Sequence, residues 1–322
     1  VSLLAPNYLV RGGPYGQKVL VWAVATVLVA ACSTRAGRPC QPEFLARQAT
    51  TDARPWTVEV TYAAGGLVVQ PADARYLYRL EACLEPDGRA LHARWDSAAA
   101  RLEIALPRSD RPRHGGAISV RRGGERRLRV ELNPRRPLDL RLTIGAVGAQ
   151  LRLGGLSLRR LEIQSNAAGF ELRFDRPNPL VAEKIAIAAN AAGFKARGLG
   201  FAHARTIVVD ASLAGAELDF DGDWDGAPPE ARVDVRTNLG GVTVRMPRRA
   251  DLAVELRARA ALGGVEAADL RPAGEAYRSA NWSSAKRRVV IDARAALGGV
   301  VFRWVETDRA NGDAPADASR RF

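Results

Sequence analysis

Residues 238–247, NLGGVTVRMP, contain the motif that decides the fold of this 322-residue chain. A step of small residues with glycine is followed there by a segment that alternates apolar and polar side chains. The step occurs seven times, and the last glycine of each copy is Gly148, Gly169, Gly193, Gly215, Gly241, Gly264 or Gly299. The spacings of 21, 24, 22, 26, 23 and 35 residues are typical of solenoids, in which each repeat forms one coil of a stack.

The side chains around each glycine fit one coil of such a stack. A glycine at a corner permits a positive φ or a close backbone approach that a Cβ would prevent. The positions predicted to point into a shared interior are apolar, namely Leu151, Leu153, Leu172, Phe174, Leu218, Phe220, Val242 and Val244. The residues between them, Arg152, Arg173, Asp219 and Thr243, are predicted to face outward. Because each repeat alone would leave its apolar face in water, only the stack is stable.

Strand-like alternation also precedes the repeats, and Ala63–Val68 resembles an earlier copy of the glycine step. We therefore predict an all-β fold, a stacked single-coil β-solenoid with glycine corners. Residues 57–137 form an irregular N-terminal β segment in this prediction, and residues 138–305 form the β-repeat domain. The alternative is a β-sandwich with glycines in its hairpins, but a sandwich predicts no repeated corner sequence. The alternating segments are Thr57–Tyr62, Arg101–Leu106, Leu128–Leu132 and Leu138–Leu142.

From about residue 57 to residue 305 the chain resembles the bacterial toast-rack proteins, a family of adhesin-type envelope domains. The family includes the C-terminal domain of cell-wall-active antibiotic response regulators. Besides the glycine steps, the resemblance rests on NLGGVTVRMP at 238–247, LDFDGDWDG at 218–226 and ALGGVVFRW at 296–304. The arginine-rich stretch 107–137 departs from the pattern. The resemblance implies a narrow solenoid of stacked β coils with no known catalytic site.

The N-terminal residues have the pattern of a bacterial export signal. The apolar run Val19–Ala31 is shorter than the roughly 20 residues that a membrane-spanning helix needs. It ends in Val29-Ala30-Ala31-Cys32, which resembles the lipobox of bacterial lipoprotein precursors. The resemblance implies that residues 1–31 are a signal peptide and that lipidated Cys32 anchors an exported chain to an envelope membrane, with the outer membrane as one option. The alternatives are an ordinary signal peptide that ends at a cysteine, or a buried N-terminal helix.

Polar, proline-containing sequence flanks the β region on both sides. We predict a flexible linker at residues 32–56 and a disordered tail at residues 306–322. Once Cys32 is assigned to lipid, Cys40 and Cys83 remain. These two either form a disulfide in an oxidising compartment or stay as thiols.

The charge of the chain favours acidic partners. The formal net charge is +13, and removal of Arg11 and Lys18 with the leader leaves +11. Nucleic acid is not predicted, because the densest basic runs, 111–116 and 121–129, lack interleaved aromatic residues for base stacking. An exported lipoprotein would instead meet anionic envelope polymers, lipid headgroups or membrane proteins. The alternative is that the dispersed arginines are ordinary solvent-exposed residues on the strand faces and bind no partner.

Few motifs indicate metal binding or catalysis. Asp221, Asp223 and Asp225 have the spacing of a Ca²⁺-binding loop, but Arg232 stands where such a loop has its bidentate glutamate. A turn with solvated aspartates is the favoured interpretation, and no metal or cofactor is predicted. The three histidines, His92, His114 and His203, show no zinc-site spacing, and no G-x-S-x-G elbow is present.

These observations predict a non-enzymatic envelope lipoprotein whose repeat surface binds a ligand or regulates a partner. The alternative is a β-solenoid lyase or hydrolase that cleaves an anionic polysaccharide, with acids and arginines on one face of the coil. Arg173, Asp219 and Asp234 are the residues that such an enzyme would use. A shared fold type does not by itself supply a catalytic site, so the binding role is preferred.

Overall fold

The computed structural model describes residues 43–49, 52–83, 91–106, 126–191, 193–213 and 215–306. These residues form 21 β-strands and one short 3-10 helix, η1 (Leu199–Ala202), and none of them is in an α-helix. The predicted signal peptide, Cys32, Cys40, His114 and the predicted tail after residue 306 lie outside the described residues.

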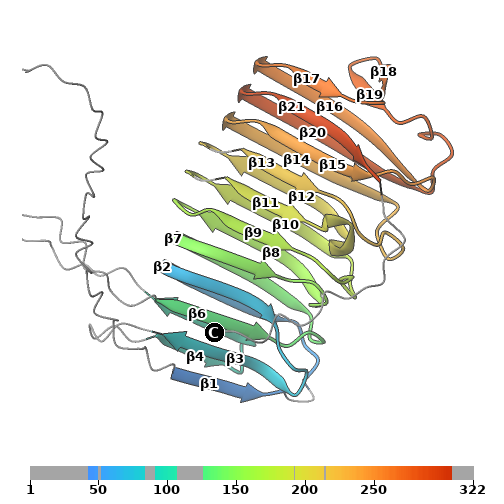
Figure 1. The fold of residues 1–322 in the computed structure, drawn as a ribbon. Coiled ribbons are helices and arrows are strands. Elements are labelled where there is room, and N and C mark those ends of the chain that lie inside the picture. Colours follow the sequence, from blue (N-terminus) through green and yellow to red (C-terminus); the bar gives the residue numbers. More distant parts are fainter. Residues whose placement is uncertain are drawn as a thin grey trace, which may run out of the picture. The chain divides into compact units, whose positions relative to one another are not determined.

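The strands belong to one sheet, and the glycine corners divide it into two rows (Figure 1). Row A contains the strand that precedes each corner and the strands that extend this set at its two ends. In spatial order these are β4 (His92–Asp96), β5 (Arg101–Leu106), the first half of β2 (Trp56–Pro71), the first half of β7 (Leu138–Arg152), β8 (Leu158–Ser165), β10 (Ala182–Ala189), β12 (Ala204–Ala211), β14 (Glu230–Leu239), β20 (Arg287–Leu297), β16 (Leu252–Leu262), β19 (Ala276–Arg278) and β18 (Arg271–Ala273).

Row B contains the strand that follows each corner and the strands that extend this set at one end. Their spatial order is β1 (Glu43–Gln48), β3 (Tyr76–Cys83), β6 (Arg127–Leu132), the second half of β2, the second half of β7, β9 (Phe170–Arg173), β11 (Phe194–Arg197), β13 (Ala216–Asp219), β15 (Val242–Pro247), β21 (Val300–Val305) and β17 (Val265–Ala267).

Parallel pairing runs through the stack, and antiparallel strands cover its ends. Neighbours are parallel from β5 and β6 to β16 and β17. At one end β4 pairs antiparallel with β5, and β3 and then β1 extend β6. At the other end β19 and β18 extend β16. These additions occupy backbone groups that an edge strand would otherwise expose.

The predicted glycine corners stack in register. Gly66, in the predicted earlier copy, pairs with Gly148. In the coils that follow, a Cβ on the corner glycine would contact the carbonyl oxygen of the next corner glycine. The contacts run from Gly169 to Gly193 at 3.5 Å, Gly193 to Gly215 at 3.5 Å, Gly215 to Gly241 at 3.4 Å, Gly241 to Gly299 at 3.1 Å and Gly299 to Gly264 at 3.0 Å.

The coils depart from chain order at both ends of the stack, so repeats that are successive in the sequence are not always neighbours in space. The β2 coil lies between β5 and β6 on one side and β7 on the other. The last coil, β20 and β21, lies between the β14/β15 coil and the β16/β17 coil. Insertion gives each of these coils a ladder partner on both sides. The spacing of 35 residues before Gly299 is the longest because this part of the chain also contains strands β18 and β19.

The inward-facing residues of both rows form one hydrophobic cluster. All eight positions predicted to point inward belong to it, and each is at most 2% exposed. Among the residues predicted to face outward, Arg152 and Arg173 are exposed, and Asp219 and Thr243 are partly exposed. The alternating segments predicted before and at the start of the repeats are strands β2, β5, β6 and β7. The predicted solenoid-type β fold is therefore confirmed.

The predicted linker contains structure. Within residues 32–56, strand β1 pairs antiparallel with β3 over Glu43–Gln48, so this part is not a flexible connection. The strand was not predicted from the sequence, because β1 lies at an edge of the sheet and all six of its side chains are exposed. Cys83, at the end of β3, is disulfide-bonded, which favours the disulfide over the free thiol at this position.

Candidate binding surface

Five arginines form a ladder on the outer face of row B. In spatial order the ladder is Arg152, Arg173, Arg197, Asp219, Arg245 and Arg303, one residue from each consecutive strand from β7 to β21. We call this set the arginine ladder. Adjacent strands lie about 4.8 Å apart, so the backbone positions of the guanidinium groups repeat at about this distance.

The repeat itself places these side chains together. Each member of the ladder stands four residues after a corner glycine, as Arg173 does after Gly169. Successive side chains of a strand point to opposite faces, so the first and third residues after the glycine are buried and the second and fourth face outward. Because the corner glycines stack in register, the outward residues of successive coils line up.

A second outward column lies between the ladder and the corner, and it contains most of the nearby carboxylates. Its members are Gln150, Glu171, Lys195, Glu217, Thr243 and Val301. Glu217 forms ion pairs with Lys195 at 3.1 Å and with Arg245 at 3.0 Å. The hydrogen bond from Lys195, with Arg245 nearby, lowers the pKa of the Glu217 carboxyl. Glu217 is therefore ionised at neutral pH and neutralises part of the charge of Lys195 and Arg245.

The other arginines of the ladder have weaker charge compensation than Arg245. Arg197 approaches Glu171 at 3.6 Å, and Arg303 approaches Glu266 at 3.9 Å. Arg152 donates to the neutral side chain of Gln150 at 3.2 Å. Within the described part of the chain, neither Arg152 nor Arg173 forms an ion pair with a carboxylate. These two neighbouring arginines are therefore the members of the ladder that are most available to a ligand.

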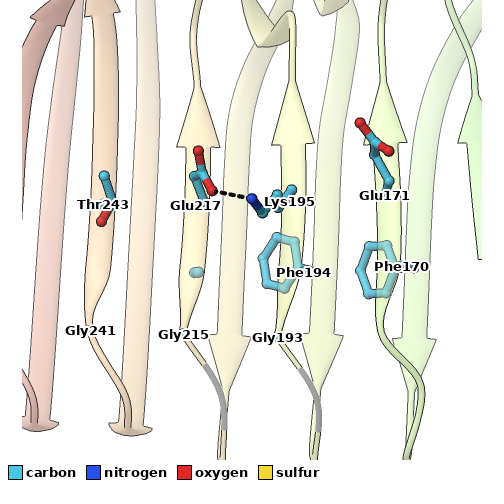
Figure 2. A pocket seen from close by; sticks show the side chains of 10 residues that line it. Phe170, Glu171, Gly193, Phe194, Lys195, Gly215, Glu217, Gly241 and Thr243 are labelled. Carbon is cyan, nitrogen blue, oxygen red and sulfur yellow. Dashed lines mark ion pairs between the residues drawn. The ribbon is translucent and has the colours of Figure 1, made fainter.

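A shallow groove runs beside the ladder, across β9, β11, β13 and β15. Its volume is about 560 Å³, and the corner glycines Gly193, Gly215 and Gly241 form part of its lining. Figure 2 shows the rings of Phe170 and Phe194 side by side along it, with Lys195 directed at Glu217. The two rings are stacked with centroids 5.0 Å apart. The glycines leave this strip of backbone uncovered, so an extended ligand could lie across several strands.

The residues named for a glycan-cleaving enzyme do not converge. Arg173 and Asp219 both belong to the arginine ladder, with Arg197 between them. Asp234 lies on β14 in row A, so the core separates it from the other two. His203 is buried, and its ring nitrogens lie 2.9 Å from the carbonyl oxygens of Asn178 and Asp223, which is a structural role.

The three aspartates with Ca²⁺-loop spacing lie in the turns after β13. The carboxylates of Asp221 and Asp223 accept backbone N–H groups, from Gly222 and Asp225 respectively. Asp225 faces Arg249 at 3.5 Å and Arg287 at 3.8 Å. Among the described residues, no group of three histidine, cysteine, aspartate or glutamate side chains is close enough to hold a metal ion.

The sequence shows the arginine excess directly, but along the unaligned chain these arginines are dispersed. The signal that identifies the ladder is the constant offset of four residues from each corner glycine, which becomes visible once the repeats are aligned on that glycine. The one helical segment among the described residues, η1, has four residues, so none of the helical structure there could span a bilayer.

No protein-family model and no curated protein matches the chain. Three solved structures show a distant likeness in fold. A "putative cell adhesion protein" from Clostridium sporogenes is 14% identical with a TM-score of 0.40, and the match covers 83% of this chain and 100% of that one. A "putative adhesin" from Bacteroides fragilis is 8% identical, with a TM-score of 0.39 and coverage of 82% and 97%. A "putative lipid binding protein" from Parabacteroides distasonis is 6% identical, with a TM-score of 0.30 and coverage of 84% and 98%. These values assign the chain to no family.

Proposed function

We propose that this chain is a non-catalytic binding protein of the bacterial cell envelope, and that the outer face of row B binds an extended anionic polymer. The observation that carries the proposal is the arginine ladder, which places five arginines and one aspartate on six consecutive strands. In this proposal Cys32 is the lipid anchor and the solenoid is displayed from the membrane.

The chemistry of arginine supports a polyanionic ligand. The guanidinium is always charged and presents a planar fork that matches carboxylate and phosphate groups. Like charges on adjacent strands destabilise a sheet by themselves, so a ladder of arginines has no evident benefit for folding. A polymer with a negative charge on each unit would relieve this repulsion, and its chain could follow the groove beside the ladder.

The carboxylates beside the ladder limit the expected affinity. Glu171, Glu217 and Asp219 repel an anion, and they neutralise part of the central arginines. We therefore expect contact to be strongest at the end that contains Arg152 and Arg173. Because these side chains are exposed, salt screens the attraction, and binding should weaken as ionic strength rises.

The test is binding of polygalacturonate to the full-length chain in neutral detergent, with dextran as the uncharged comparison. The double variant Arg152→Gln/Arg173→Gln should bind about tenfold more weakly, which corresponds to roughly 0.7 kcal/mol for each arginine. The matched control is Arg205→Gln/Arg232→Gln, which removes the same charge from exposed positions of row A. The control should change affinity less than about twofold. Equal losses in both variants, or no binding of the polyanion at low salt, would contradict the proposal.

A further inference from the structure

Four leucines are exposed in one column at the corner of the last coils. Leu213, Leu239, Leu297 and Leu262 are 57%, 44%, 45% and 68% exposed. Each stands two residues before a corner glycine. Leu297 pairs in register with Leu239 on one side and Leu262 on the other, and the Leu239 N–H donates to Ser212, the residue before Leu213. We call this column the leucine edge.

The corner that carries the leucine edge has no charged residue. Eight corner segments, from the β2 coil to the last coil, contain no Asp, Glu, Lys or Arg, although 26% of the chain is charged. A single exposed leucine is ordinary on a protein surface, but an aligned column of them on an uncharged strip indicates contact with an apolar phase. The segments are residues 63–69, 142–149, 165–170, 189–194, 211–216, 237–243, 260–265 and 295–302.

Basic side chains flank the leucine edge. On row A, Arg236, Arg294 and Arg259 pair in register, each three residues before a leucine of the edge. These arginines are 58%, 54% and 74% exposed, and their partners Asp210, Asp292 and Glu275 are surface carboxylates at 3.9, 3.3 and 3.1 Å. On row B, Arg245 and Arg303 of the arginine ladder lie beyond the corner.

From this arrangement we infer that the leucine edge docks onto an anionic lipid bilayer. The leucines enter the boundary between headgroups and acyl chains, and the flanking arginines contact anionic headgroups, as in interfacial membrane-binding segments. A second protein molecule fits the edge less well, because four side chains are far fewer than the roughly 20 residues that each partner brings to a stable protein interface. The inference does not depend on polymer binding, since the two arginines expected to contact the polymer most strongly, Arg152 and Arg173, do not flank the edge.

A polarity-sensitive fluorophore on the edge tests this inference in the full-length chain on vesicles. Leu262→Cys places the label on the edge, and Leu45→Cys places it on an exposed leucine of β1, at the opposite end of the stack. Leu45 also lies close in sequence to the predicted anchor at Cys32. A chain held by its N-terminal residues alone would therefore bring the label at 45 to the membrane at least as readily as the label at 262.

On vesicles with phosphatidylglycerol, the label at 262 should shift to shorter wavelength and be quenched by nitroxide-bearing lipids, while the label at 45 should not. Both changes at 262 should be lost when Leu213, Leu239 and Leu297 are replaced by threonine. Both changes should be weaker on purely zwitterionic vesicles.

A label at 262 that remains exposed to water on anionic vesicles would overturn the inference. So would a shift that appears without vesicles and grows with protein concentration, because it would identify a second copy of the chain at the edge. Loss of quenching in the variant Arg152→Gln/Arg173→Gln would show that membrane contact requires the arginine ladder as well as the leucine edge. This result would also count against the inference.

Discussion

At the start of the repeats, the outer faces of rows A and B differ in how their charges are paired. On row A, charges of opposite sign form ion pairs between neighbouring strands in this part of the stack. Glu59 of β2 accepts from Arg101 of β5 and, at 3.0 Å, from Arg141 of β7, and Arg160 of β8 donates to Glu183 at 2.8 Å. On row B, Arg152 and Arg173 face each other as like charges. In this part of the stack, row A therefore uses its charges in ion pairs between strands, whereas Arg152 and Arg173 of row B have no carboxylate partner among the described residues.

The junction between the rows gives the largest expected effect. Gly298 has a φ of 147°, and a Cβ there would clash with the carbonyl group of Gly240 in the neighbouring coil. We expect Gly298→Ala to lower the free energy of unfolding by about 3 kcal/mol, because it combines backbone strain with a steric clash. Denaturant titration measures this. Gly264→Ala is the control, since a Cβ at Gly264 meets no atom within 4 Å, and it should change stability by less than about 0.5 kcal/mol. Equal effects would contradict the stacked corner.

The end of row A gives the next largest effect. Glu255 is 2% exposed. It accepts a hydrogen bond from Arg278 at 2.7 Å and forms an ion pair with Arg257 at 2.6 Å. Burial raises the pKa of the Glu255 carboxyl, but the bonds from Arg278 and Arg257 outweigh burial, so its pKa is lowered. Glu255→Gln should cost about 2 kcal/mol at pH 7.

The cost of Glu255→Gln should depend on pH in a defined direction. A carboxyl with a lowered folded-state pKa contributes stability above its unfolded value of 4.5, and this contribution is lost as pH falls through the folded-state pKa. The difference in unfolding free energy between wild type and variant should therefore be constant near neutrality and shrink below pH 4.5. A difference that stays constant down to acid pH would show that Glu255 is not ionised in the folded state.

A single cross-strand pair in the middle of row A should matter less. Glu59→Gln removes the partner of both Arg101 and Arg141, and we expect a loss of about 1 kcal/mol that shrinks in high salt. Glu103→Gln is the control, because Glu103 lies beside Glu59 in register and forms no ion pair within the described residues. Chemical unfolding at low and high salt separates the two variants. If Glu103→Gln lowered the free energy of unfolding as much as Glu59→Gln, the effect could not be assigned to the ion pairs of Glu59.

The arginine ladder should show the smallest effect on stability. Arg173→Gln removes a like-charge neighbour of Arg152 and Arg197, so the free energy of unfolding should stay the same or rise by a few tenths of a kcal/mol. The comparison is Arg160→Gln on row A, which removes the partner of Glu183 and should destabilise the protein. Thermal unfolding of both variants checks the difference. Destabilisation by Arg173→Gln would show that this arginine serves the fold.

The sequence predicts the coil better than it predicts the stack. The corner glycines, the buried column that includes Leu172 and Phe174, and the outward position of Arg173 follow from a local period that each repeat carries by itself. The insertion of the β20/β21 coil between its neighbours could not be predicted, because every coil offers the same kind of backbone edge to a partner. Strand β1 was missed because its exposed side chains leave no burial pattern in the sequence.

The binding surface was only half visible for a related reason. Outward positions such as Arg152 and Arg173 are predictable from alternation, but their assembly into one ladder depends on the register between coils. Of the residues considered for catalysis, Arg173 and Asp219 face outward as predicted, but Asp234 does not share their face because it lies on β14 in row A. Side-chain direction along a strand is local information, whereas the identity of the neighbouring strand is not.

Hydrogen–deuterium exchange with and without a bound polyanion tests the central claim most directly, because it reports on both rows in one experiment. With an oligogalacturonate in excess, peptides that cover β9 and β11 of row B should exchange more slowly, and peptides that cover β10 and β12 of row A should not change. Slower exchange on row A, or on neither row while the polyanion is bound, would contradict the assignment of the ligand to the arginine ladder.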